Sequence, residues 1–394
     1  MSGQEVASGR YRYIGLCTVR TAGRDRLKFG VGGVCVRCEQ VDAESAMASG
    51  RYSPDRWICT RQYFFFTLWF PVEFDMMSFR SVTGFLFARC FGPAGCLVLL
   101  FAGSLSVGFE ASAQEIRHSF FVAGPNFTGI IDEDGKRTWG ARRAGARDGW
   151  VLDNGNVLVA WANVVQELTR QHEVVFEYRL DQSNREIGTA QRLPGGNTLV
   201  TELGGNPRLL EITAEGKIAV EVPLRPETDN AHMQTRMARK LSSGNYLVPH
   251  LLAFKVKEYT PTGEVVREIA TDGKELGGRE AENWPFTAIR LDNGNTVVCL
   301  THGNKVVEFG PDGKVVWKVS QSDLPSKPFD DACGGQRLPN GNTVITAYHA
   351  KEGVKLFEVT PDKKIVWTYE GPSRAHHFQI LTTNGTPIVG RPLK

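Results

Sequence analysis

The side chains best suited to chemistry in this sequence lie close together around His232. The local pattern predicts a strand on which alternation places His232, Gln234 and Arg236 on one side. An imidazole beside a guanidinium suits an oxyanion, because the imidazole can act as nucleophile or acid–base group while the guanidinium clamps two oxygens. Asp229 could orient the imidazole. Alternatively, Asp229 and Asn230 only shape a turn, and Arg236 pairs with a neighbouring acid.

Two other clusters carry comparable groups. Asp330 and Asp331 are adjacent carboxylates that could bind calcium or act as acid and base, or could simply form a turn. His376 and His377 are adjacent on a predicted strand, so their rings point to opposite sides and one of them faces inward. We expect His377 to be the inward one, with Gln379 on the same side.

These groups lie within a repeat that predicts the fold. A period in the forties with about four short alternating strands is typical of a β-propeller blade. Each repeat also holds a second turn, usually of the Pro-Asp-Gly type, so we name its strands A to D, joined by tight A–B and C–D turns. The A–B turns contain Gly-Asn or Asn-Gly and recur at intervals of 41 to 50 residues, at Gly155, Gly196, Gly244, Gly294, Gly341 and Gly385.

Six A–B turns predict an all-β propeller of six blades. Phe120–Ala123 and residues 129–136 predict a B strand and a C–D hairpin, whereas His377–Leu381 and residues 387–389 predict an A and a B strand. The two ends together complete one blade, which closes the ring and removes open sheet edges. Seven blades are the alternative if the first strand belongs elsewhere.

Small residues fix the register of the A strands. Inner strands crowd around a propeller axis, so small side chains are expected on them, and in this register His377 aligns with Asp148 and Thr287. The small residues stand three positions before a leucine, at Gly149, Ala190, Ala238, Ala288 and Gly335.

The turns divide the propeller into two faces. The tight turns form one face, here called the tight-turn face, and the longer B–C and D–A connections form the other, the long-loop face. His250 and His302 fall at B–C connections, and His232 and His377 fall at D–A crossings. Function is usually carried by loops on a rigid scaffold, so we expect a site on the long-loop face, at the mouth of the axial channel. Trp284 adds an aromatic side chain there that could stack a ring or pack between blades.

Residues 1–113 differ from the rest of the chain and hold six of its eight cysteines. The segment 77–113 has the order of a secretory signal peptide: Arg80 near its start, an apolar run over 95–109 and a small-residue site ending at Ala113. We expect cleavage after Ala113, a mature propeller of residues 114–394, and a periplasmic or extracellular location. A membrane anchor over 95–109 is the alternative, and this segment is the only expected contact with a membrane.

We interpret residues 1–76 as an over-extended gene start, with Met77 the true initiator, or as a disordered leader. The pair Cys35 and Cys38 is a weak zinc signal because its partners are irregular. In the body of the chain, Cys299 is expected to be a buried apolar thiol, and a disulfide with Cys333 is not indicated.

The charge distribution argues against nucleic acid as a partner. Residues 1–113 contain twelve Lys and Arg against nine Asp and Glu, which equals the +3 net charge of all 394 residues. The body is therefore neutral, whereas nucleic-acid binding needs a basic footprint. Walker, dinucleotide, nucleophile-elbow and HExxH motifs are absent from the sequence, and no metal set or cofactor is assigned beyond the calcium alternative.

The repeat itself resembles known families. Residues 294–298 and 312–317, with the sequences Gly-Asn-Thr-Val-Val and Asp-Gly-Lys-Val-Val-Trp, resemble the repeats of PQQ-like propellers and of bacterial arylsulfotransferases. The arylsulfotransferase family has a functional histidine in a segment similar to 229–235, which implies a role for His232. Its later Arg-His pair is matched by Pro249-His250. The cofactor residues of PQQ enzymes have no counterpart, so PQQ is not expected.

The sequence thus predicts an exported propeller that binds a small molecule or a protein at its long-loop face, with no reaction assigned. The alternative is an arylsulfotransferase-like transferase or hydrolase of a small anionic ester. In that hypothesis His232 is the nucleophile or acid–base group, Arg236 clamps the anion, and His250 or His377 converges on them.

Overall fold

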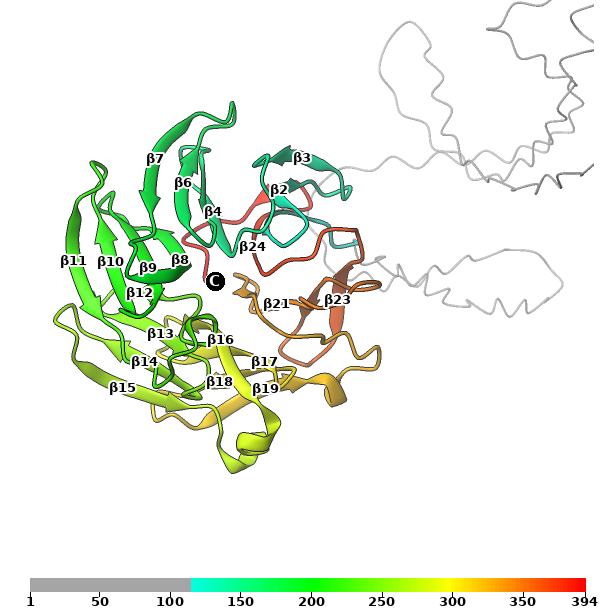
Figure 1. The fold of residues 1–394 in the computed structure, drawn as a ribbon. Coiled ribbons are helices and arrows are strands. Elements are labelled where there is room, and N and C mark those ends of the chain that lie inside the picture. Colours follow the sequence, from blue (N-terminus) through cyan, green and yellow to red (C-terminus); the bar gives the residue numbers. More distant parts are fainter. Residues whose placement is uncertain (1–114) are drawn as a thin grey trace, which may run out of the picture. The chain divides into compact units, whose positions relative to one another are not determined.

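The computed structural model describes residues 115–394, which form six antiparallel sheets around a central axis (Figure 1). The prediction of a six-bladed β-propeller is confirmed. The segments 1–76 and 77–113, which we interpreted as leader and signal peptide, lie outside the described residues.

Five blades consist of four consecutive strands each. The first contains β4 (Asp148–Val151), β5 (Val157–Ala160), β6 (Val164–Leu168) and β7 (Val174–Arg179). The second contains β8 (Asn184–Arg192), β9 (Thr198–Gly204), β10 (Arg208–Ile212) and β11 (Ile218–Pro223). The third contains β12 (Arg239–Lys240), β13 (Tyr246–His250), β14 (Lys255–Tyr259) and β15 (Val265–Ala270).

The fourth blade contains β16 (Asn283–Arg290), β17 (Thr296–His302), β18 (Lys305–Phe309) and β19 (Val315–Ser320). The fifth contains β20 (Gly335–Arg337), β21 (Thr343–Thr346), β22 (Leu356–Val359) and β23 (Ile365–Tyr369). Four short 3-10 helices lie in D–A crossings of the described chain, at η1 (Ala231–Met233), η2 (Lys274–Leu276), η3 (Arg279–Ala281) and η4 (Gln321–Asp323).

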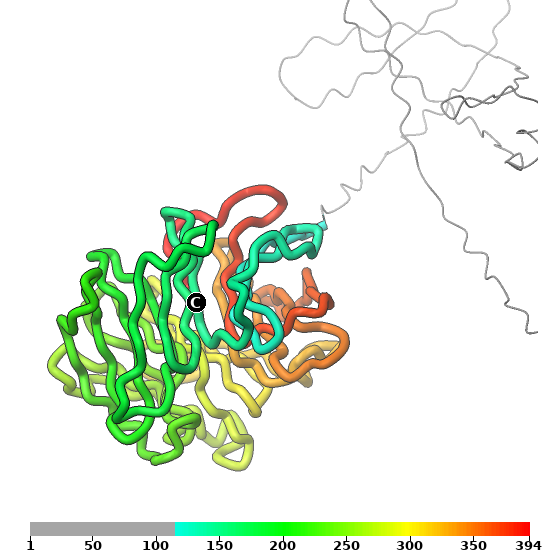
Figure 2. Tube along the Cα trace, turned by 45° about the horizontal axis from the view of Figure 1, so that its top comes forward, coloured from blue at the N-terminus to red at the C-terminus, as the bar shows by residue number. Residues whose placement is uncertain are grey.

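The sixth blade combines both ends of the described chain. Its inner strand is β24 (His377–Thr383), followed outward by β1 (His118–Ala123), β2 (Thr128–Ile131) and β3 (Arg137–Gly140). Figure 2 shows the red C-terminal strand beside the start of the described chain. The shared blade is confirmed, but the predicted B strand at 387–389 is wrong. Because β1 already pairs with one edge of β24, the returning β25 (Thr386–Pro387) pairs with the other edge.

The core is divided into wedges between neighbouring blades, which explains the small residues of the A strands. In one wedge Cys299, Ile345 and Phe357 are all buried. A Cβ atom added at Gly335 would lie 2.4 Å from Cys299 Sγ, and one added at Gly149 would lie 2.6 Å from a ring carbon of Phe121. The A strands are therefore crowded, as the small residues predicted. Each of these two glycines packs against the B strand of the adjacent blade.

A repeated polar contact, here called the inter-blade staple, joins neighbouring blades on the tight-turn side at five of the six blade boundaries. A glutamate on the C strand accepts a hydrogen bond from the asparagine of its own A–B turn, as between Asn295 and Glu308 at 2.7 Å. The same glutamate also binds a cation at the end of the next A strand, as Glu308 binds Arg337 at 2.8 Å. The five glutamates of these contacts are Glu167, Glu211, Glu258, Glu308 and Glu358.

Candidate functional site

The long-loop face holds a cavity of about 420 Å³ at the axis, here called the loop-face cavity. A ring of residues at the start of successive A strands contributes to its lining. Each ring member lies two positions before the residue that sets the register of its own A strand. That residue is usually the small one described above. The members of the ring that line the cavity are Arg147, Arg236, Phe286, Cys333 and His376.

Arg236 places a buried cation on this cavity, with 1 % of its side chain exposed. Its Nη1 donates to the carbonyl of Thr235 at 2.6 Å, and its Nη2 donates to the carbonyl of His232. The buried Nε has no acceptor among the described residues. Burial lowers the pKa of Arg236 to about 10, against the opposing charge of Glu186, so the guanidinium remains protonated at neutral pH.

One carboxylate, that of Glu186 on β8, serves two arginines. Arg147 Nη2 donates to Glu186 Oε2 at 2.6 Å, and Arg236 Nη2 lies 3.3 Å from Glu186 Oε1. Burial opposes ionisation of Glu186, but hydrogen bonds from His232 and Arg147 and the charge of Arg236 lower its pKa to about 2. Two guanidinium groups therefore share one negative charge.

His232 stands at the rim, with 63 % of its side chain exposed and its Nδ1 3.4 Å from Glu186. The prediction that alternation places it beside Gln234 and Arg236 on a strand is wrong, because η1 and the turn after it occupy this crossing and β12 begins only at Arg239. His232 and Arg236 still meet, through the carbonyl of His232. Gln234 turns away and bonds the backbone of Gly204.

Another side of the cavity carries a second acid–imidazole group. Asp331 Oδ2 lies 2.5 Å from His349 Nδ1 and 3.9 Å from His302 Nε2, and Asp331 Oδ1 accepts from the backbone N–H of His302 at 2.7 Å. Trp284 stacks on His302 with 4.2 Å between ring centroids. His302 and Asp331 both have positive φ, at 53° and 59°. Side chains held in this unfavourable backbone region often mark functional sites.

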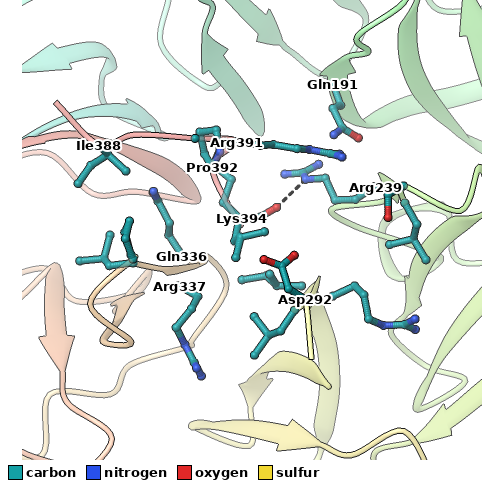
Figure 3. A pocket seen from close by; sticks show the side chains of 18 of the residues that line it. Gln191, Arg239, Asp292, Gln336, Arg337, Ile388, Arg391, Pro392 and Lys394 are labelled. Carbon is teal, nitrogen blue, oxygen red and sulfur yellow. Dashed lines mark hydrogen bonds between the residues drawn. The ribbon is translucent and has the colours of Figure 1, made fainter. Parts of the chain in front are cut away.

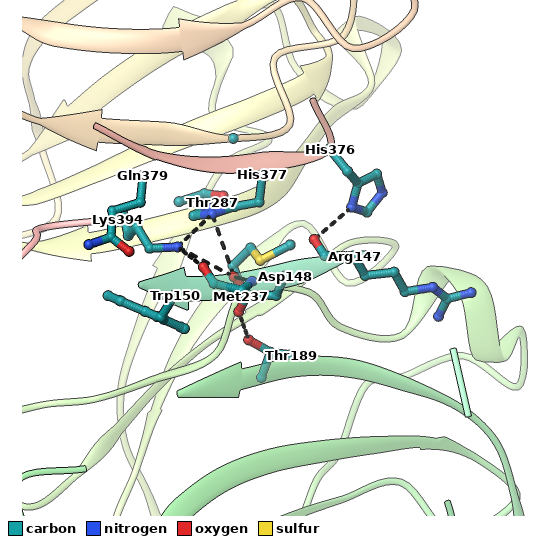
Figure 4. Close-up of polar contacts among 12 residues, drawn as sticks. Arg147, Asp148, Trp150, Thr189, Met237, Thr287, His376, His377, Gln379 and Lys394 are labelled. Carbon is teal, nitrogen blue, oxygen red and sulfur yellow. Dashed lines mark hydrogen bonds and ion pairs between the residues drawn. The ribbon is translucent and has the colours of Figure 1, made fainter. Parts of the chain in front are cut away.

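Aromatic rings pack around His376. Phe286 and Tyr348 meet the ring edge-on, at 4.8 and 4.9 Å between centroids. His376 Nδ1 donates to the carbonyl of Arg147 at 3.1 Å (Figure 4), which leaves Nε2 as an acceptor. Burial, followed by the nearby charge of Arg236, lowers the pKa of His376 to about 3, so this imidazole is neutral at physiological pH.

The cysteine in the ring of the cavity is not a nucleophile in this state. Cys333 and Cys299 are both free and buried. Burial raises the pKa of the Cys333 thiol, which keeps it protonated at neutral pH.

Several predicted site residues lie away from the cavity. His250 is fully buried and its Nε2 is 3.0 Å from the Tyr259 hydroxyl, while burial holds its pKa well below the usual value. Asp229 and Gln234 border a separate shallow pocket, and Asn230 is exposed beside it. Asp330 is exposed, and its carbonyl accepts from the backbone of His349.

His377 belongs to a buried ionic cluster one residue further along the strand than His376 (Figure 4). Its Nδ1 lies 3.2 Å from Lys394 Nζ and 3.5 Å from Asp148 Oδ1, and Arg239 donates to Asp148 at 2.8 Å. Burial and the charge of Lys394 hold the pKa of His377 well below its usual range. His377 does point inward, as expected, but it is fully buried and does not line the loop-face cavity; its Nδ1 is held by Lys394, and its buried Nε2 has no partner among the described residues. Gln379 also faces a neighbouring strand and accepts from the backbone N–H of Val151.

A larger cavity of about 580 Å³ opens at the tight-turn end of the A strands (Figure 3). Three of its basic side chains, Lys240, Arg290 and Arg337, are the basic members of inter-blade staples and are bound to glutamates. Arg239 and Lys394 are paired with Asp148. Arg391 donates to the carbonyl of Lys240. None of the described residues that line it is a histidine. We therefore place the candidate site in the loop-face cavity.

Within residues 115–394, no group of three or more His, Cys, Asp or Glu side chains is placed to hold a metal ion. Asp330 and Asp331, the candidates for calcium, do not form such a group in this part of the chain. No helix in the same range has the length and apolar character needed to cross a membrane.

Sequence reasoning missed Arg147, Glu186 and the roles of His349 and His376. A signal for two of them was present, because Arg147, Arg236 and His376 share one register position at the start of the A strands. The sequence prediction instead chose the next position along the strand, which contains His377. That position is buried inside the protein and does not line the cavity.

The fold and the cavity define a β-propeller with a polar, ligand-sized site at its axis. The chain belongs to the Mal s 1 allergenic protein-like family, whose model matches residues 111–338, more than half of the chain. No curated protein matches the chain.

The likeness to one solved structure supports the fold. A Bacteroides caccae protein of unknown function is 21% identical, with a TM-score of 0.59 over 70% of this chain and 100% of that one. A catalytically inactive virginiamycin B lyase from Staphylococcus aureus with quinupristin is 17% identical, with a TM-score of 0.46 over 64% of this chain and 84% of the lyase. The propeller domain of Cps50 (Swd1) from Myceliophteria thermophila is 16% identical, with a TM-score of 0.45 over 65% and 87%. At these identities the likeness concerns the fold alone.

Proposed function

We propose that this protein binds a small organic anion in the loop-face cavity. The supporting observation is the charge at its floor, where Arg147 and Arg236 share the single carboxylate of Glu186. The buried Nε of Arg236 also lacks an acceptor among the described residues. Because buried charges are normally paired and hydrogen-bonded, an anionic ligand group would supply the missing partner.

The rest of the lining suits an apolar or aromatic ligand body. Met233, Leu251, Phe286 and Tyr348 contribute apolar surface next to the arginines. The volume is within the range of sites for small molecules, which combine apolar walls with a few polar groups. A ring bearing one anionic substituent would place its charge at Arg236 and its body against these side chains. Binding of a protein segment at the mouth is the alternative occupant.

The proposal is tested by calorimetric titration with benzenesulfonate and its neutral analogue benzenesulfonamide. We expect the sulfonate to bind about tenfold tighter or better, since a charge-assisted contact with a buried guanidinium favours it. Arg236→Met should abolish this difference, whereas Arg179→Met, which removes an exposed arginine of β7, should retain it. Equal affinity for both compounds in the wild type would refute the proposal.

An enzymatic role is the second candidate, favoured by the contact of His232 Nδ1 with Glu186. A carboxylate that orients an imidazole leaves Nε2 free as a base or nucleophile, and Arg236 could stabilise the developing charge. The matching activity is arylsulfotransferase-like transfer from, or hydrolysis of, a small anionic ester.

Turnover of aryl sulfate, phosphate and carboxylate esters tests this second role. We expect His232→Ala to lower the rate by about a hundredfold, the usual contribution of one acid–base group. His250→Ala, which removes a ring buried away from the cavity, serves as the matched control. If no ester is consumed by the folded wild type, the binding role stands alone.

We also propose that the protein is exported and that nucleic acid is not a partner. The support is the signal-like order of residues 77–113 and the neutral charge of the remaining chain. Sequencing the N-terminus of protein recovered from a cell envelope or medium should give Gln114. A start at or before Met77 would contradict cleavage.

A further inference from the structure

We infer that Glu186 sets the charge of the ligand, so that the loop-face cavity selects singly charged anions over doubly charged ones. This inference rests on the proposed function and narrows its ligand class to monoanions such as carboxylates and sulfonates.

Glu186 acts on the cavity without forming its wall. It is absent from the lining and sits behind three residues that line it, with contacts of 2.6 Å to Arg147, 3.3 Å to Arg236 and 3.4 Å to His232. Its side chain is 11 % exposed. A change of charge at Glu186 can therefore alter the field in the cavity without removing any side chain that lines it.

The charged groups at the floor sum to one positive charge. Arg147 and Arg236 contribute two cations and Glu186 one anion. His376 donates Nδ1–H to a carbonyl and is packed edge-on by two aromatic rings, so it adds no charge. His232 is mostly exposed at the rim, where solvent screens it. The sum covers only the groups that contact Glu186. Asp331 is a further carboxylate on another side of the cavity, 2.5 Å from His349 Nδ1 and 3.9 Å from His302 Nε2, and it makes the lining as a whole more negative than the floor.

A monoanion makes this buried set neutral. A dianion leaves one uncompensated negative charge beside the buried guanidinium of Arg236, with Glu186 immediately behind the arginines and Asp331 also bordering the cavity. Uncompensated buried charge is strongly unfavourable, and repulsion of the wrong ligand is a common source of specificity. The carboxylate of Glu186 thus acts as a charge filter, disfavouring ligands that carry two negative charges.

The experiment compares benzenesulfonate with phenylphosphonate, which have similar shapes and differ in charge when the phosphonate is doubly ionised. Titrations at about pH 8.5, where imidazoles are ordinarily neutral, remove protonated histidine from the comparison. We expect wild type to prefer the sulfonate by about tenfold or more. Glu186→Gln raises the net charge of the floor by one and should shift the preference toward the phosphonate by at least about tenfold.

Two further variants hold the charge while changing the side chains. Glu186→Asp keeps the negative charge and should keep the sulfonate preference. The double variant Arg147→Gln with Glu186→Gln returns the floor to one positive charge and should restore the preference that Glu186→Gln loses. If Glu186→Gln does not fold, Arg147→Gln alone decides, because it should weaken the sulfonate without strengthening the phosphonate.

The outcomes separate this inference from the proposed function. If neither anion binds to the wild type, the proposed function fails. If both bind but the phosphonate equals or exceeds the sulfonate, or if Glu186→Gln leaves the preference unchanged, the charge filter is refuted and anion binding survives.

Discussion

Glu186 links the candidate site to the stability of the fold, because one carboxylate holds Arg147, Arg236 and His232. Burial opposes its ionisation, but its hydrogen bonds and the charge of Arg236 lower its pKa from 4.5 to about 2. Since the pKa is lower in the folded than in the unfolded chain, the carboxylate stabilises the fold above the unfolded value. That contribution is lost as the pH falls toward about 2.

The pH dependence of unfolding measures this contribution. The free energy of unfolding of wild type, relative to Glu186→Gln, should fall by about 3 kcal/mol between about pH 5 and about pH 2. Glu177→Gln, which removes a carboxylate paired with an exposed arginine on β7, is the control. Urea denaturation at a series of pH values checks the prediction, and parallel curves for wild type and Glu186→Gln would contradict it.

At the same scale, the sequence names several residues that line the cavity but not the carboxylate behind them. The lining residues it names are His232, Arg236, Trp284, His302 and Asp331. His232 and Arg236 are four positions apart, and their meeting could be anticipated. Glu186 lies 46 positions before His232, on another blade, and its polar type alone does not distinguish it from surface glutamates. Local alternation also failed at Gln234, because a 3-10 turn replaced the expected strand in the crossing.

Among the elements, the A–B turn shows why the repeat is so regular. Its glycine was predictable from turn geometry, and φ is indeed positive at each of these glycines, as at Gly294 with 85°. The adjacent asparagine has a second role that periodicity does not reveal. Asn295 donates to Glu308, which in turn binds Arg337 of the next blade, so turn formation and blade association depend on the same residues.

Breaking one staple should weaken the fold measurably. Glu308→Gln removes the charge that holds Arg337, in a pair whose side chains are only 16 % and 12 % exposed, and should cost about 2 kcal/mol. Lys314→Gln removes an exposed pair with Asp312, which solvent screens, and should have a much smaller effect. Chemical denaturation of both variants gives the comparison. Equal losses would mean that the staple adds no more than a surface ion pair.

For the whole molecule, closure of the ring depends on β1 and β24, which come from opposite ends of the described chain. The contact that closes the ring is an inter-blade staple in which a histidine replaces the usual arginine. The ring of His118, on β1, lies 2.7 Å from Glu358. Composition and period predicted that both ends share a blade. They did not predict which strand pairs with which edge, since the alternating patterns of β1 and the 387–389 segment are equivalent.

A covalent link across the closing pair tests whether this seam limits the stability of the propeller. Ser119 and Thr382 are paired, and their hydroxyl oxygens are 2.7 Å apart, so cysteines at these positions should form a disulfide. The two residues are 263 positions apart, and closing so long a loop should stabilise the fold by about 5.6 kcal/mol in the chain-entropy model. We expect Ser119→Cys with Thr382→Cys to raise the Tm by several degrees when oxidised, and to return to the wild-type value on reduction. Each single variant is a control for the loss of the hydroxyl contact. If the oxidised and reduced forms melt together, unfolding begins at another blade boundary and the seam is not the weakest part of the ring.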